Sequence, residues 1–74
     1  MNKARRKKLE EAYELIEKAQ GIIEGVREEE EEAHDNLPEG IQNGERGQQM
    51  EEYIEYLNQA WDGCDDVMAN LNEI

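Results

Sequence analysis

The sequence predicts an all-α protein, an antiparallel hairpin of two long helices with coiled-coil-like packing. In each half of the chain, apolar residues recur at alternating steps of three and four. The two repeats have the same length, and the only proline lies between them together with three of the six glycines. Packed helices repeat at this spacing, whereas half-buried strands alternate at every second residue.

The first repeat predicts a helix over about residues 3–34, and the second predicts a helix over about residues 47–73. Each repeat spans about 36 Å at 1.5 Å per residue, so the two helices can pair along their whole length. The first repeat has one polar member, Glu30, and consists of Leu9, Ala12, Ile16, Ala19, Ile23, Val26, Glu30 and Ala33. The second repeat consists of Met50, Tyr53, Leu57, Ala60, Cys64, Val67, Leu71 and Ile74.

The connection over about residues 35–46 ends the first helix and delays the second. Pro38 is expected to begin a short helical turn, and Asn43 is the expected N-cap of the second helix. A connection this short makes the two helices antiparallel neighbours. We therefore expect residues 1–74 to form a single helical-hairpin domain.

Each predicted helix carries more apolar residues than one partner helix can cover. A chain of 74 residues rarely builds a sufficient core alone, and one cysteine cannot form an internal disulfide. We therefore expect a homodimer that completes a four-helix bundle. The alternative is a monomer with an exposed apolar ridge. The residues expected at the dimer interface are Tyr13, Leu15, Ile22, Ile54, Trp61 and Met68.

The chain is strongly acidic, with 20 Asp and Glu against 8 Lys and Arg and a net charge of −12. Such a surface repels nucleic acid and anionic membranes and attracts basic partners. It is either a solvated surface or an imitation of nucleic-acid phosphates that inhibits a nucleic-acid-binding protein. The expected acidic surface comprises Glu28, Glu29, Glu31, Glu32, Glu51, Glu52, Glu55, Asp62, Asp65 and Asp66.

Five of the eight cations form a basic arm at the start of the first helix: Lys3, Arg5, Arg6, Lys7 and Lys8. Cations at a helix N-terminus oppose the helix dipole. In an antiparallel hairpin they lie beside the C-terminus of the second helix, where they would complement its carbonyl groups. The alternative is a docking arm for an acidic partner or for nucleic acid, although five cations without an interleaved aromatic residue are a weak nucleic-acid signature.

Glu31 and His34 form a Glu-x-x-His pair, an element of di-metal sites in helical bundles. The facing positions, Met50 and Tyr53, are poor metal ligands, so a di-metal bundle is a remote alternative and no cofactor is expected. The sequence holds one histidine and no catalytic triad or phosphate-binding loop. We therefore expect a non-enzymatic protein-interaction module.

No secretory signal and no apolar membrane span is evident, which favours the cytoplasm. The motifs Asn36-Leu37-Pro38-Glu39, Glu45-Arg46-Gly47 and Met50-Glu51 resemble those of small acidic helical-hairpin proteins of phage and prophage genomes. The chain departs from that pattern at Gly40 and Asn43-Gly44, where small polar residues are usual. The family has no established activity. The resemblance implies a phage accessory protein in the host cytoplasm, and it favours anti-CRISPR-like inhibition of a host or anti-phage defence protein as the alternative function.

Overall fold

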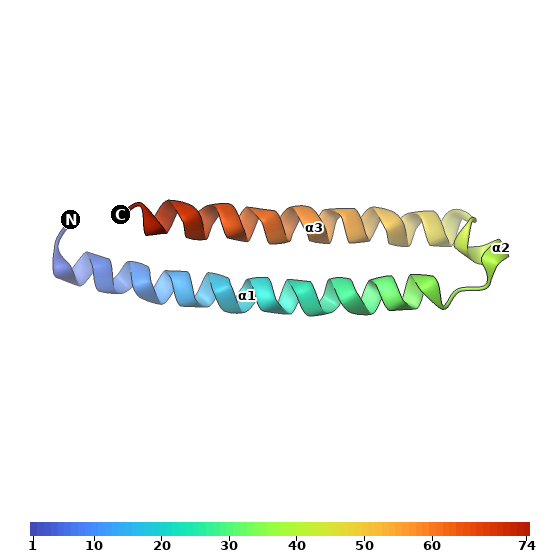
Figure 1. Cartoon of the computed structure of the whole chain (residues 1–74), viewed down its shortest axis with the longest axis horizontal. Helices are drawn as coiled ribbons and strands as arrows, with labels where there is room; N and C mark the ends of the chain where they lie inside the picture. Colours follow the sequence, from blue (N-terminus) through green and yellow to red (C-terminus); the bar gives the residue numbers. More distant parts are fainter.

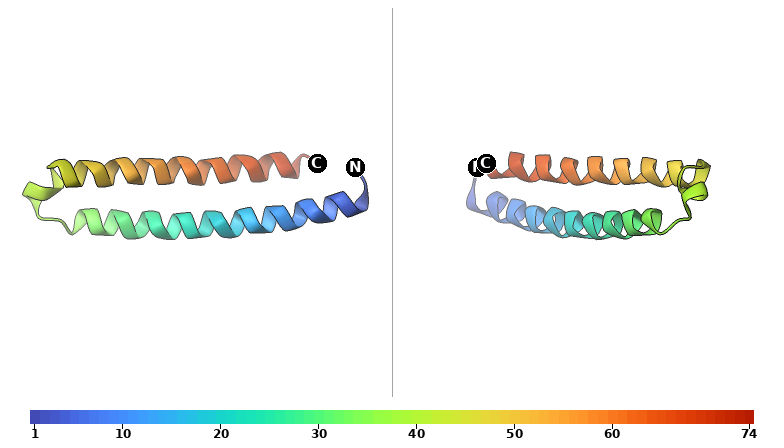
Figure 2. Two further views of the ribbon diagram at one scale, coloured as in Figure 1. Left: turned by 180° about the vertical axis from the view of Figure 1, so that it is seen from behind. Right: turned by 45° about the vertical axis from the view of Figure 1, so that its right-hand side comes forward.

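The computed structural model describes residues 1–74 and contains three helices: α1 (Lys3–Asp35), α2 (Glu39–Gln42) and α3 (Glu45–Asn72). The long helices α1 and α3 lie side by side and run in opposite directions, and the short helix α2 closes one end (Figures 1 and 2). The molecule is an elongated rod of 58 × 14 × 12 Å. The prediction of an all-α protein with one long helix pair is confirmed.

The helix ends use local hydrogen bonds, and one of them differs from the prediction. The Asn2 side chain caps α1 by accepting a hydrogen bond from the backbone N–H of Arg5 at 2.8 Å. Pro38 precedes α2, as expected. Asn43 does not cap α3; it is the C-cap of α2, and Gly44 is the N-cap of α3. Because α2 occupies four residues of the connection, α3 begins after Gly44 rather than after Asn43.

Helix α2 packs tightly against the first turn of α3. Gly47 is buried there, and a Cβ atom at this position would overlap the backbone carbonyl of Gln42. The Gln42 side chain in turn donates a hydrogen bond to the carbonyl of His34 at 3.1 Å. The glycine therefore lets α2 join the end of α1 to the start of α3.

The residues between α1 and α3 form a seam that differs from the predicted one in a regular way. Every seam residue is buried or half-buried. On α1 the seam consists of Leu9, Tyr13, Ile16, Gln20, Ile23, Arg27, Glu30 and His34. On α3 it consists of Met50, Ile54, Leu57, Trp61, Cys64, Met68 and Leu71. Every second residue of each predicted repeat is kept in the seam, as Leu9 and Ile16 are in α1. Each residue between them is replaced by the next residue toward the C-terminus, as Ala19 is replaced by Gln20.

This shift corrects the predicted seam. Ala19, Val26, Ala33, Tyr53, Ala60, Val67 and Ile74, all expected between the helices, are exposed. Both helices are rotated by about 50°, half the ~100° between successive residues of an α-helix. The rotation places Ile54, Trp61 and Met68 in the seam, where they bury more apolar surface than Tyr53, Ala60 and Val67 would. The larger side chains of α3 therefore select the seam.

The helix pair has little core of its own. Met68, 6% exposed, is the only buried hydrophobic residue, and Gly47 is the only other buried residue. All the other seam residues keep part of their surface in water. A chain that buries this little apolar surface gains limited stability from its own packing.

Candidate functional site

Exposed apolar side chains follow a second line along α1, beside the seam. Leu15 and Ile22 are each 62% exposed, and Val26 is 44% exposed. Half-buried Ala12 and exposed Ala19 complete the line at the same alternating steps of three and four. All five residues directly precede a seam residue, as Ala19 precedes Gln20. The line therefore lies on one side of the seam.

Helix α3 carries a matching line of exposed apolar residues. Tyr53, Tyr56 and Val67 are between 44% and 58% exposed, and Ala60 is exposed between them. Ile74, 49% exposed, lies just past the end of the helix. Here too the members on the helix directly precede seam residues, as Ala60 precedes Trp61. Two antiparallel helices are related by an approximate two-fold axis perpendicular to the plane that contains both of them. This axis keeps each side of the plane on the same side. Residues that directly precede a seam residue therefore lie on the same side of the helix pair in both helices.

The two lines therefore form one continuous surface, which we call the apolar face: Ala12, Leu15, Ala19, Ile22, Val26, Tyr53, Tyr56, Ala60, Val67 and Ile74. It extends along most of the rod and across both long helices. A contiguous apolar surface of this extent is typical of an interaction site rather than of scattered exposed residues.

Carboxylates gather on the opposite side, at positions that follow the seam residues. We call this surface the acidic face: Glu10, Glu14, Glu17, Glu24, Glu28, Glu31, Asp35, Glu51, Glu55, Asp62 and Asp65. All these residues are exposed. Of the residues predicted for the acidic surface, Glu28, Glu31, Glu51, Glu55, Asp62 and Asp65 lie on this face. Glu32, Glu52 and Asp66 lie on the backs of the helices, and Glu29 adjoins the apolar face.

Polar seam residues connect the two helices at the edge of the acidic face. Arg27 donates a hydrogen bond to Asn58 Oδ1 at 3.1 Å and lies 3.8 Å from Glu24 Oε1. His34 Nε2 lies 3.2 Å from Glu51 Oε1. Because one arginine reaches a residue of each helix, Glu24 and Asn58 must share one side of the pair. These contacts confirm that the two lines of acidic positions form one face.

Two seam atoms are buried without a hydrogen bond, Arg27 Nε and His34 Nε2. His34 Nε2 is within ion-pair distance of Glu51, but the approach lies outside hydrogen-bonding geometry. Farther along the seam, Gln20 donates a hydrogen bond to the backbone carbonyl of Trp61 at 3.2 Å. The polar half of the α1 seam therefore fixes the register of the helices while leaving some of its own groups unsatisfied.

The six residues expected at a dimer interface divide between two places. Leu15 and Ile22 lie on the apolar face. Tyr13, Ile54, Trp61 and Met68 lie in the seam instead. The opposite error affects Ala19, Val26, Tyr53, Ala60, Val67 and Ile74, which were expected between the two helices but lie on the apolar face. The signal that distinguishes the two lines is side-chain size, because Trp61 and Met68 are much larger than their neighbours Ala60 and Val67.

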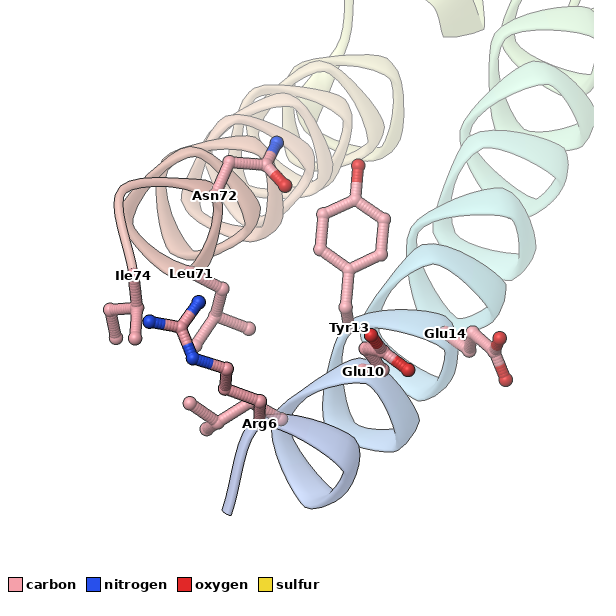
Figure 3. Close-up of a pocket in the computed structure, with 8 residues that line it drawn as sticks. Arg6, Glu10, Tyr13, Glu14, Leu71, Asn72 and Ile74 are labelled. Atoms are coloured by element: carbon pink, nitrogen blue, oxygen red, sulfur yellow. The ribbon is translucent and has the colours of Figure 1, made fainter. Parts of the chain in front are cut away.

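The basic arm makes no ion pair within the chain, since all three ion pairs involve Arg27 or His34. Figure 3 shows Arg6 extending from α1 toward Leu71 and Ile74 of α3. These residues line an open pocket of about 360 Å³ between the helix ends, together with Tyr13 and others. Arg6 thus lies beside the C-terminal turn of α3, whereas Arg5 and Lys8 continue the α1 line of the apolar face.

The structure brings together no group of three or more His, Cys, Asp or Glu side chains that could hold a metal ion. Glu31 projects from the acidic face, and His34 lies in the seam near Glu51. Cys64 is a free, half-buried seam residue.

None of the three helices has the length and apolar character needed to cross a membrane. Comparisons with protein-family models, with curated proteins and with solved structures found no match. The resemblance to small acidic phage proteins therefore remains a hypothesis based on the loop motifs.

Proposed function

We propose that the chain is a non-enzymatic, self-associating protein-interaction module. In this proposal its antiparallel hairpin places the apolar face against the apolar face of a second copy, and the two hairpins form a four-helix bundle. The observation that carries the proposal is the division of each helix into two apolar lines, of which the seam covers only one. Leu15 and Ile22, both 62% exposed, lie on the uncovered line.

The charge distribution supports a second copy as the occupant of the apolar face. Two chains of net charge −12 repel each other, yet most carboxylates lie on the acidic face or on the backs of the helices. Face-to-face association directs the two acidic faces away from each other, so that they remain in water. The apolar faces can then come together with the least desolvation of charge.

Self-association is tested by the mass in solution, measured by light scattering after size exclusion over a range of protein and salt concentrations. We expect a dimer that tightens with salt, because salt screens the acidic repulsion and strengthens apolar burial. Ile22→Glu should abolish the dimer, because it places a charge in the middle of the apolar face. Gly21→Glu is the matched control: it adds the same side chain one residue away on the acidic side, where nothing lies within 4 Å of a Cβ.

A wild-type monomer at every concentration would overturn the proposal. Equal loss of the dimer in Ile22→Glu and Gly21→Glu would do the same, because association would then depend on total charge rather than on the apolar face. Circular dichroism of both variants would establish that the helices remain formed.

The second candidate function is inhibition of a nucleic-acid-binding protein, in keeping with a phage accessory protein in the host cytoplasm. The alignment of Glu10, Glu17, Glu24 and Glu31 at seven-residue spacing along one face favours it, because a regular row of carboxylates can occupy a basic groove. The acidic face stays available when the apolar face is covered. The two functions are therefore compatible.

This second function is tested by competition with DNA for purified nucleic-acid-binding proteins. Replacing Glu17, Glu24 and Glu31 by Gln should weaken the competition and its dependence on salt, while the dimer remains. Undiminished competition by this triple variant would reject the acidic face as the binding surface.

A further inference from the structure

We propose that the second copy docks end for end, so that α1 of each chain packs antiparallel to α1 of the other and the two connecting loops lie at opposite ends of the bundle. In this arrangement Lys8 of each chain lies beside Glu29 of the second copy. The inference deepens the proposed self-association and rests on it. The arrangement that it excludes places both loops at the same end.

Opposite charges lie at the two ends of the apolar line of α1. Lys8 lies seven residues before Leu15, and Glu29 lies seven residues after Ile22, so both continue the exposed apolar line. The line is therefore basic at one end, apolar in the middle and acidic at the other end. Lys8 makes no ion pair within its own chain, and neither does Glu29. An antiparallel second α1 places these opposite charges side by side.

The apolar lines of both helices have their midpoints at nearly the same level of the rod. The uninterrupted apolar line of α1 runs from Ala12 to Val26, with Ala19 at its middle, and Glu29 separates it from Ala33. The line of α3 runs from Tyr53 to Val67 and continues to Ile74 just past the end of the helix, with its middle beside Gly63. Gln20 bonds to the carbonyl of Trp61, so Ala19 and Gly63 lie at nearly the same height. A single two-fold axis at this level therefore aligns the apolar line of α1 with that of α1 in the second copy, and the apolar line of α3 with that of α3 in the second copy.

The residues at that axis are small. Ala19 is one of the two alanines between Lys8 and Val26 in the α1 line, and Gly63 lies between Ala60 and Val67 on α3. A Cβ at Gly63 would meet nothing within 4 Å. A residue on a two-fold axis faces the same residue of the second copy. Small residues at this position therefore let the two helices approach closely. Larger residues, such as Leu15 and Ile22, then pack on either side of the axis.

The same-end arrangement lacks this complementarity. It places α1 of one chain against α3 of the other, where Lys8 lies at the level of Ile74 and Glu29 at the level of Ile54. Among its side chains, the apolar face of α3 offers no Asp or Glu at the level of Lys8 and no Lys or Arg at the level of Glu29. The two basic arms would also lie at one end of the bundle and repel each other.

A charge-exchange experiment tests the orientation. We expect Lys8→Glu and Glu29→Lys each to weaken the homodimer about tenfold at low salt, because each places two like-charged pairs in the dimer. Mixing the two variants should restore affinity through a heterodimer with both pairs attractive, measured by native mass spectrometry. Lys7→Glu and Glu28→Lys are the matched controls, with the same changes one residue away on the acidic side. Homodimers that weaken without preferential heterodimer formation would overturn the proposal.

Disulfide formation provides an independent test in a Cys64→Ala background. Ala19→Cys should form an intermolecular disulfide with itself, because position 19 meets its own copy only in the end-for-end dimer. In the same-end dimer, Ala19→Cys would instead link to Gly63→Cys when the two variants are mixed. A stable dimer with that second pattern overturns the orientation and leaves self-association intact, whereas a monomeric chain overturns both.

Discussion

The seam and the apolar face are built from adjacent lines of the same two helices, yet they differ in the size and polarity of their residues. The seam takes Ile54, Trp61 and Met68 from α3 and accepts polar residues such as Gln20 and Arg27 from α1. The apolar face holds three alanines, but also Tyr53 and Tyr56, which are 49% and 58% exposed. The pair therefore covers Trp61 and Met68 internally and accepts polar groups in its seam.

This comparison separates two kinds of stability. Seam contacts stabilise the helix pair within one chain, whereas contacts of the apolar face add stability only when a second copy is bound. Substitutions in the seam should therefore act at every protein concentration, and substitutions on the apolar face should act in proportion to dimer formation.

The largest effect is expected for Trp61→Ala, which removes the largest seam side chain. We expect a loss of about 2–3 kcal/mol, below the range for fully buried aromatics because Trp61 is only half-buried. Thermal melts should show this loss at all concentrations. Tyr56→Ala, which truncates an aromatic residue 58% exposed on the apolar face, should lower the melting temperature only at concentrations where dimers form. Identical behaviour of the two variants would remove the distinction between seam and face.

The next effect is expected at the junction of α2 and α3. Gly47→Ala should destabilise the chain by about 2 kcal/mol, because the added methyl group overlaps the backbone of Gln42 and forces α2 away from α3. Urea unfolding followed by circular dichroism measures the change. A variant as stable as the wild type would show that α2 is not held against α3 in solution.

A smaller effect of opposite sign is expected for Gly25→Ala. The glycine lies within α1, and nothing lies within 4 Å of a Cβ at this position. The substitution should stabilise α1 by about 0.5–1 kcal/mol through helix propensity alone. Urea unfolding should show the gain both in the wild-type background and in Ile22→Glu. A loss of stability would indicate that another backbone contacts this position in the assembled protein.

The smallest effect is expected for Arg27→Met, which keeps an unbranched side chain in the seam and removes an unsatisfied Nε. The lost hydrogen bond to Asn58 and the removed desolvation cost should nearly cancel, leaving a change within about 1 kcal/mol. Asn58→Ala is the comparison variant and should destabilise more, because it removes the hydrogen bond of the arginine and leaves it only the 3.8 Å ion pair with Glu24. A large loss in Arg27→Met would instead assign the polar seam residues a main role in stability.

Local sequence features were sufficient to predict the elements. Pro38, the glycines after it and the equal lengths of the two repeats indicated where the long helices begin and end, and these features act within a few residues. The Asn43 cap was misplaced, because the packing of α2 against Gly47 decides which residue precedes α3. Local rules do not include that contact.

The side of each helix that faces its partner was harder to predict, because α1 and α3 each carry two overlapping apolar lines. Heptad spacing describes the line through Ala60 and Val67 as well as the line through Trp61 and Met68. Exposure distinguishes them: Met68 is buried, and Val67 is 44% exposed. Of the residues predicted for the interface, Leu15 and Ile22 therefore lie on an uncovered surface, while Tyr13 and Trp61 lie in the seam.

The helical content, the approximate lengths of the helices and the excess of acidic charge follow from the amino-acid sequence, because spacing, proline and glycine act locally and charge is a sum. The rotation of each helix about its axis follows only from the packing of the two helices. That rotation depends on the total apolar surface buried between two chain segments, and here the large side chains of α3 outweigh the polar groups of α1. The same rotation places the apolar lines of both helices on one face and most of the carboxylates on the other.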